Sequence, residues 1–113
     1  QAREIAGVPV LATLLEGASG KDLRGHGDVL LDKIGPGVVV LGASEGTKAS
    51  LLVKVSSAFT DRVHAGNLVR ELAPLVDGSG GGRPDMAQAG GKNPGGLEAA
   101  MERAYSLIET ALG

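Results

Sequence analysis

Residues 80–91 read Gly-Gly-Gly-Arg-Pro-Asp-Met-Ala-Gln-Ala-Gly-Gly and form the centre of a glycine-rich segment that runs from Gly78 to Gly96. Eight of the 19 glycines of the 113-residue chain lie in this segment, at positions 78, 80, 81, 82, 90, 91, 95 and 96. Glycine lets a backbone adopt positive φ and approach a bulky group closely. Arginine, here Arg83, is suited to phosphate. The segment therefore predicts a glycine-rich loop that faces an anion.

A purely structural role for the same segment stays open. Consecutive glycines also permit a tight chain crossing packed against a sheet. In that arrangement Arg83 would pair with Asp85 or Asp77. The residues alone do not decide between the two roles.

The chain before this segment predicts alternating strands and helices. Val8–Leu15 is a nearly continuous apolar run of strand length, and a helix capped by Ser19 or Asp22 is expected after it. Two buried strands, 38–41 and 49–55, follow and are expected to form a hairpin.

Two more helices are expected later in the chain. Thr60 is a suitable N-cap for a helix that ends near residues 74–78. Asn93 followed by Pro94 predicts the start of a C-terminal helix, whose apolar stripe runs to Leu112. This order of elements predicts one α/β domain over residues 1–113, a small two-layer sandwich with a mixed sheet and about three helices, in which the glycine-rich loop precedes the C-terminal helix.

Composition excludes several classes of function. The absence of cysteine removes disulfides, thiolate metal sites and thiol nucleophiles. His26 and His64 lack partners at ligand spacing, and Asp28 with Asp32 fits a solvated helix face better than a catalytic pair. A net charge of −2 gives no global attraction to nucleic acid. We therefore expect no catalytic residue and no metal in this domain, and no membrane association.

Gly80–Gly91 resembles the signature of the C-terminal (C-Ala) domain of alanyl-tRNA synthetases, a module distantly related to the C-terminal domain of DHH phosphoesterases. Val8–Val10, Gly37–Leu41 and Ala65–Val69 are similar to that family as well. Exonuclease-type relatives usually have histidine at the position of Arg83. The synthetase branch is therefore favoured, also by Pro84, Asp85, Met86 and Gln88.

The resemblance implies a domain without chemistry of its own that grips the elbow of tRNA and couples aminoacylation with editing. Its parent would be a cytoplasmic alanine-tRNA ligase, and residue 1 would lie inside that longer chain. ATP, magnesium and zinc would belong to the upstream domains. The tRNA-binding residues expected on this basis are Gly80, Gly81, Gly82, Arg83, Pro84, Asp85, Gln88, Gly90, Gly91, Lys92, Lys54 and Arg62.

Three other functions remain open at this point. The chain could be a dimerisation module that uses the C-terminal helix or a sheet edge. It could bind single-stranded nucleic acid or another substrate for a DHH-type phosphoesterase. It could also be the C-terminal module of a free-standing alanyl-tRNA editing hydrolase. The acidic balance is unfavourable for a tRNA binder. With only Phe59 and Tyr105 as aromatic residues, base stacking cannot be the source of affinity.

Overall fold

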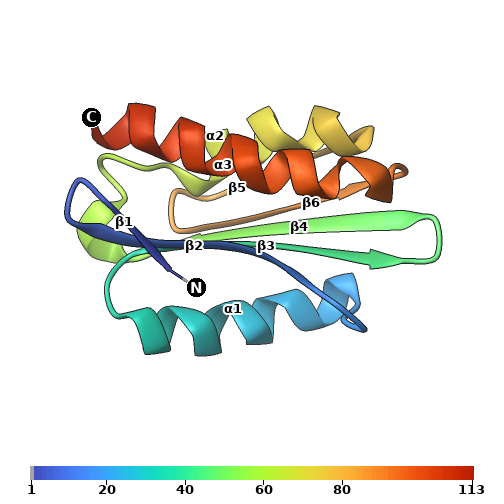
Figure 1. The fold of residues 1–113 in the computed structure, drawn as a ribbon, viewed down its shortest axis with the longest axis horizontal. Helices are drawn as coiled ribbons and strands as arrows, with labels where there is room; N and C mark the ends of the chain where they lie inside the picture. Colours follow the sequence, from blue (N-terminus) through green and yellow to red (C-terminus); the bar gives the residue numbers. More distant parts are fainter. Residues whose placement is uncertain (1) are drawn as a thin grey trace.

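Residues 2–113 are described by a computed structural model and form a six-stranded mixed sheet with α-helices on both of its faces (Figure 1). The elements, in chain order, are β1 (Arg3–Ile5), β2 (Val8–Leu15), α1 (Gly20–Ile34), β3 (Val38–Glu45), β4 (Lys48–Val55), the 3₁₀ helix η1 (Ser57–Phe59), α2 (Ala65–Leu72), η2 (Ala73–Val76), β5 (Gly78–Gly82), β6 (Met86–Gly91), η3 (Pro94–Gly96) and α3 (Leu97–Leu112).

The strand order across the sheet is β1-β2-β3-β4-β6-β5. β2 and β3 pair in parallel, through the α1 crossover, and the other neighbours in this order are antiparallel. The strand predicted at Val8–Leu15 is confirmed, and the predicted hairpin is β3–β4, with eight pairs from Val38↔Val55 to Glu45↔Lys48. The α/β class, the mixed sheet and the three helices are therefore confirmed.

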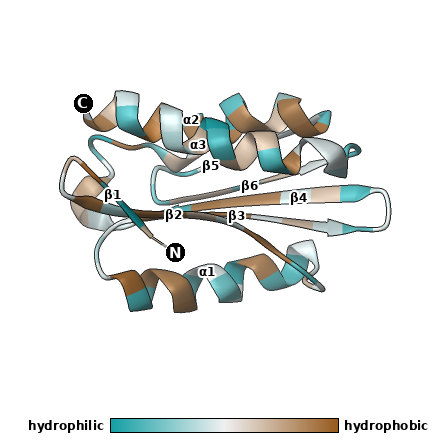
Figure 2. Ribbon diagram, viewed as in Figure 1, coloured by the Kyte–Doolittle hydropathy of each residue, from teal (hydrophilic) through white to brown (hydrophobic). Residues whose placement is uncertain are grey.

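The layering differs in one respect from the expected two-layer sandwich. Helix α1 packs against β3 and β4 on one face, and α2 and α3 cover the other face (Figure 1). Side chains of the central strands alternate between two hydrophobic cores: Leu41 and Leu52 face α1, and Val40 and Val53 face α2 and α3. The central strands are coloured largely hydrophobic in Figure 2, and their buried side chains belong to the two cores, as expected for a sheet covered by helices on both sides.

The residues that start three helical segments also bear on the predictions. Ser19 is the N-cap of α1, as expected. The helix expected after Thr60 begins later, at Ala65, because residues 57–59 form a 3₁₀ turn first. His64 caps that helix, and its Nδ1 atom accepts a hydrogen bond from the Asn67 N–H at 3.1 Å. Asn93 accepts from the Gly95 N–H at 3.1 Å and starts the turn that leads into α3.

Candidate functional site

The glycine-rich segment is a strand pair, so the expected loop is wrong as a description of its backbone. Residues 78–82 form the edge strand β5 and pair with β6 from Gly78↔Gly91 to Gly82↔Ala87. The two strands lie so close that a Cβ atom at Gly78 would be 2.1 Å from the carbonyl oxygen of Gly90, and one at Gly80 would be 2.3 Å from that of Gln88. At these two positions glycine is required by contact between backbones.

The turn at Arg83–Asp85 is fixed to its neighbours by three successive carbonyl groups. The Gly66 N–H donates to Arg83 O at 3.1 Å, the Ala65 N–H to Pro84 O at 2.8 Å, and the Val55 N–H to Asp85 O at 2.9 Å. Two N–H groups at the start of α2 are therefore used by the turn and are not available to an anion.

The side chains of this turn point outward. Arg83 Nε lies 3.4 Å from Asp85 Oδ1. This is one of the two ion pairs expected if the segment has a purely structural role. Both side chains are more than half exposed, at 66% and 56%. Exposed ion pairs of this kind contribute little to stability. Arg83 therefore remains accessible to a polyanion.

Lys54 and Gln88 lie on the sheet face next to α1. Lys54 Nζ forms a hydrogen-bonded ion pair with Asp28 of α1, and this contact lowers the pKa of the Asp28 carboxyl, with a smaller contribution from Arg24. Gln88 Nε2 donates to the Gly20 carbonyl at 3.4 Å. Both predicted residues therefore have partners within the fold.

Arg62 lies on the opposite side of the sheet from Lys54. Its Nη2 atom donates to the carbonyl oxygen of Leu112 at 2.9 Å, at the C-terminal end of α3. An arginine in this place satisfies a carbonyl that the helix leaves without an internal partner.

Gly90, Gly91 and Lys92 lie at the far end of β6 from Arg83. They help to line an open hollow of about 590 Å³ formed where β4 and β5 begin and β6 ends. The residues that line it are Lys48, Ala49, Ser50, Asp77, Gly78, Ser79, Gly90, Gly91 and Lys92. Since β6 has six residues, this hollow is about 20 Å from the turn at Arg83.

One basic residue that the sequence did not indicate lies along the edge strand between these two ends. Arg70 of α2 reaches β5, with its Nε atom 3.7 Å from the position that a Cβ of Gly81 would occupy. Its Nη1 atom donates to the Asn67 side chain at 3.1 Å. Lys48 was missed as well. Only the pairing of β4 with β6, and the packing of α2 on β5, place these residues beside the predicted ones.

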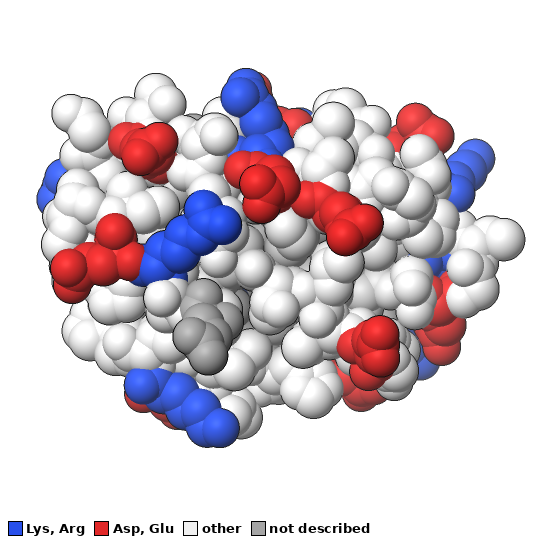
Figure 3. Space-filling model, viewed as in Figure 1, with Lys and Arg blue, Asp and Glu red and all other residues white. Residues whose placement is uncertain are grey.

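Charge is divided unevenly between the two halves of the sheet. Residues 46–92, which include β4, α2, β5 and β6, contain six Lys or Arg and four Asp or Glu. The exposed side of α3 carries three glutamates, at positions 98, 102 and 109, and one arginine, Arg103. Figure 3 shows a face with interspersed charges and no continuous basic patch. The half of the sheet that ends in the β5 edge is therefore the more basic one.

Other kinds of site find little support in residues 2–113. Among these residues no group of three or more His, Cys, Asp or Glu side chains is placed to hold a metal ion. Within the same range no helix combines the length and the apolar character that a membrane span requires.

The family model that matches this chain is that of the DHHA1 domain, and the match covers residues 7–110. This chain belongs to the DHHA1 domain family. Its curated relatives include the alanine–tRNA ligase of Anaeromyxobacter dehalogenans, 53% identical over 111 residues, and that of Pelotomaculum thermopropionicum, 46% identical over 111 residues. These alignments cover 98% and 97% of this chain but only 12% and 13% of the relatives. The DHHA1 chain thus spans about an eighth of the ligases that it matches.

Solved structures agree with this DHHA1 assignment. The C-Ala domain of Aquifex aeolicus alanyl-tRNA synthetase superposes with a TM-score of 0.87 at 27% identity, over 96% of this chain and 98% of that one. A DHH-domain protein described as a member of a family of ribosomal proteins matches with a TM-score of 0.62 at 15% identity, over 96% of this chain and 27% of that one. The second match shows a shared fold only. The expected resemblance to the C-Ala domain is confirmed.

Proposed function

We propose that this DHHA1 domain is the tRNA-binding C-terminal module of an alanine-tRNA ligase and that it grips the elbow of the tRNA. The observation that supports this most strongly is the superposition on nearly the whole Aquifex aeolicus C-Ala domain. The 53% identity to a named alanine–tRNA ligase supports the same parent enzyme. In that enzyme the domain would hold the tRNA while other domains perform aminoacylation and editing.

The β5 edge is the surface on which we place the RNA backbone. Arg83 lies at one end of this strand, Arg70 beside its middle, and Lys92 with Lys48 at the other end. Asp85 and Asp77 are acidic residues that lie among these four cations. The edge therefore offers a line of positive charge that is as long as a few nucleotides.

Contacts of this kind would recognise shape and sugar–phosphate backbone. The two aromatic residues are half-buried and pack against the core, so they supply no stacking platform. Lys54 is already paired with Asp28, and Arg62 is bonded to the Leu112 carbonyl on another side of the molecule. These two predicted residues would therefore add less to binding than the cations beside β5.

Arg83→Ala tests this assignment in a binding titration with labelled tRNA. If two or three phosphates are neutralised, the slope of log K against log salt should be about −2 to −3, and the variant should bind more weakly with a slope about 1 smaller in magnitude. The matched control is Arg103→Ala on the acidic face of α3, which removes the same charge. Equal affinity of the two variants would contradict a role for Arg83.

The remaining properties of the parent belong to the same proposal. ATP, magnesium and zinc would be bound by its other domains, and the enzyme would act in the cytoplasm without membrane attachment.

The three alternative functions predict different results. Concentration-dependent sedimentation without tRNA affinity would favour a dimerisation module, and preference for single-stranded DNA would favour a DHH-type role. Hydrolysis of mischarged tRNA by a parent that cannot activate alanine would identify an editing protein.

A further inference from the structure

A row of three residues crosses the sheet inside the hollow at the end of β6. Ser50 of β4 and Ser79 of β5 are both paired in register with Gly90 of β6. Side chains of residues directly opposite each other on antiparallel strands lie on the same face of the sheet. The two serine hydroxyls therefore flank a glycine that exposes its backbone.

Neither hydroxyl has another partner in the fold. Within residues 2–113 the structure contains no hydrogen bond from the side chain of Ser50 or of Ser79. Ser50 is half-buried and Ser79 is exposed. Both residues line the hollow, and the Ser50 Oγ also packs against Gly20 of α1, 2.7 Å from the position that a Cβ of that glycine would occupy. Both hydroxyls can donate to a ligand in the hollow.

Two lysines border this row. The pair Ala49↔Gly91 is the last of the β4–β6 ladder, so Lys48 and Lys92 are the next positions on the two neighbouring strands, and both line the hollow. Like charges on neighbouring strands repel each other. Glu45 pairs with Lys48 across the β3–β4 hairpin and Asp77 lines the hollow, yet neither lysine is within ion-pair distance of a carboxylate in the described chain. A bound anion would relieve this repulsion.

Gly90 differs from the glycines around it. At Gly91 a Cβ atom would lie 2.2 Å from Val76 O, and at Gly78 and Gly80 it would meet the backbone of β6. At Gly90 the nearest atom would be Ala49 O at 3.9 Å, an ordinary contact, and φ is not in the left-handed region. Nothing in the fold requires glycine at this position, whereas a ligand that approaches the backbone would require it.

We propose that this hollow binds a sugar–phosphate segment of RNA, with Lys48 and Lys92 neutralising the phosphate, Ser50 and Ser79 donating hydrogen bonds, and Gly90 forming the floor. The inference rests on the proposed tRNA-binding function and adds a defined contact at the end of the β5 edge away from Arg83. It assigns Lys48, Ser50 and Ser79 to binding, three residues that the sequence pattern did not indicate.

Two variants of the 113-residue chain test the hollow, with labelled tRNA as the probe. Lys48→Ala/Lys92→Ala should weaken binding at least tenfold and reduce the magnitude of the salt slope by about 1, because the two lysines neutralise one phosphate. Gly90→Ala should also weaken binding, while its midpoint of thermal unfolding stays at or above that of the wild type, because the added Cβ makes no close contact with the fold. The matched control is Lys33→Ala/Arg103→Ala, which removes the same charge from the end of α1 and from α3.

The outcomes separate the hollow from the proposed function. If the wild-type chain binds tRNA and both test variants bind like the control, the hollow is not a phosphate site, although the proposed function stands. If the wild-type chain does not bind tRNA, the proposed function and the inference both fail.

Discussion

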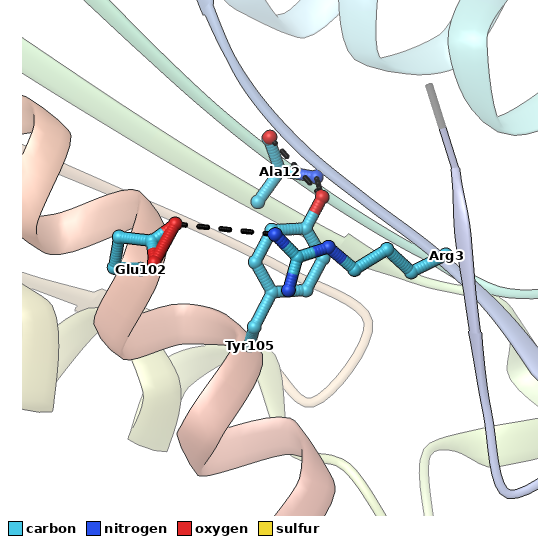
Figure 4. Close-up of polar contacts among 4 residues, drawn as sticks. All are labelled: Arg3, Ala12, Glu102 and Tyr105. Carbon is cyan, nitrogen blue, oxygen red and sulfur yellow. Dashed lines mark hydrogen bonds and ion pairs between the residues drawn. The ribbon is translucent and has the colours of Figure 1, made fainter.

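The hydroxyl of Tyr105 in α3 is hydrogen-bonded to both the N–H and the carbonyl group of Ala12 in β2, 93 positions earlier in the chain (Figure 4). It accepts from the Ala12 N–H at 3.0 Å and donates to the Ala12 carbonyl at 3.3 Å. Among residues 2–113, β1 pairs with residues 8–10 of β2, so the described part of β1 leaves the Ala12 backbone groups on that side to Tyr105. Arg3 stacks on the Tyr105 ring at 3.9 Å from its centroid. Tyr105 thus holds α3 on the sheet.

Tyr105→Phe should therefore destabilise the fold without changing its shape. The substitution removes the hydroxyl and leaves the two backbone groups of Ala12 without this partner, which should cost about 1 kcal/mol in the free energy of unfolding. Urea unfolding followed by circular dichroism measures the difference. The matched control is Ser106→Ala, which removes an exposed hydroxyl from the next position of α3 and should change the free energy by less than about 0.5 kcal/mol. A Phe variant as stable as the wild type would show that water satisfies the backbone groups of Ala12 as well as the Tyr105 hydroxyl does.

Replacement of glycine by alanine should have opposite effects on stability at two positions of the β5–β6 hairpin. Gly80→Ala places a Cβ 2.3 Å from the Gln88 carbonyl oxygen and should lower the free energy of unfolding by about 1–3 kcal/mol. Gly90→Ala meets no close atom and should be neutral or stabilise by up to about 1 kcal/mol, because it restricts the unfolded chain. Thermal unfolding of the two variants compares them directly. If both lose stability equally, β5 and β6 are not as close as described.

The Asp28–Lys54 ion pair should be visible in a pH titration. Lys54 lowers the pKa of Asp28 in the folded state, so the pair stabilises the fold above the ordinary carboxyl pKa, near 4, and this contribution is lost as the pH falls through the lower folded value. In Lys54→Met the Asp28 carboxyl should titrate at a higher pH than in the wild type. NMR detection of the Asp28 side-chain carboxyl carbon measures this titration in the wild type and in the variant. Coincident titration curves would contradict the pairing.

Arg70 should matter for binding and little for stability. It lies beside β5 and its side-chain partner is Asn67, so Arg70→Ala should change the free energy of unfolding by less than about 0.5 kcal/mol. Its loss should nevertheless weaken tRNA binding and reduce the salt slope by about 1 in magnitude. The comparison is again Arg103→Ala. Unchanged tRNA affinity would remove the middle of the β5 edge from the interface.

Much of the fold follows from local sequence signals. The continuous apolar run of Val8–Leu15 and the Asn93-Pro94 start of the last helical segment each specify their element without help from distant residues. The glycines of β5 do not specify a strand, because glycine is a poor strand former. Glycine is required there only because the backbone of β6 lies so close. The same holds for His64, which replaces Thr60 as the N-cap of α2 after a 3₁₀ turn that sequence periodicity does not reveal.

The candidate site was only partly visible in the sequence, for a similar reason. The segment from Gly80 to Lys92 is continuous, so its basic residues could be named, but the structure separates Arg83 from Lys92 by the length of β6. Lys48 and Arg70 join them only through strand pairing and helix packing. Residues brought together by tertiary structure leave no signal in local spacing.

A comparison of two labelled RNAs decides whether this domain recognises the elbow of folded tRNA, as we propose. Full-length alanine tRNA contains the elbow, whereas a minihelix made of its acceptor stem does not. At equal salt the chain should bind the full tRNA at least tenfold more tightly than the minihelix, and the Lys33→Ala/Arg103→Ala control should keep that ratio. Equal affinity for the two RNAs, or no binding to either, would contradict the claim.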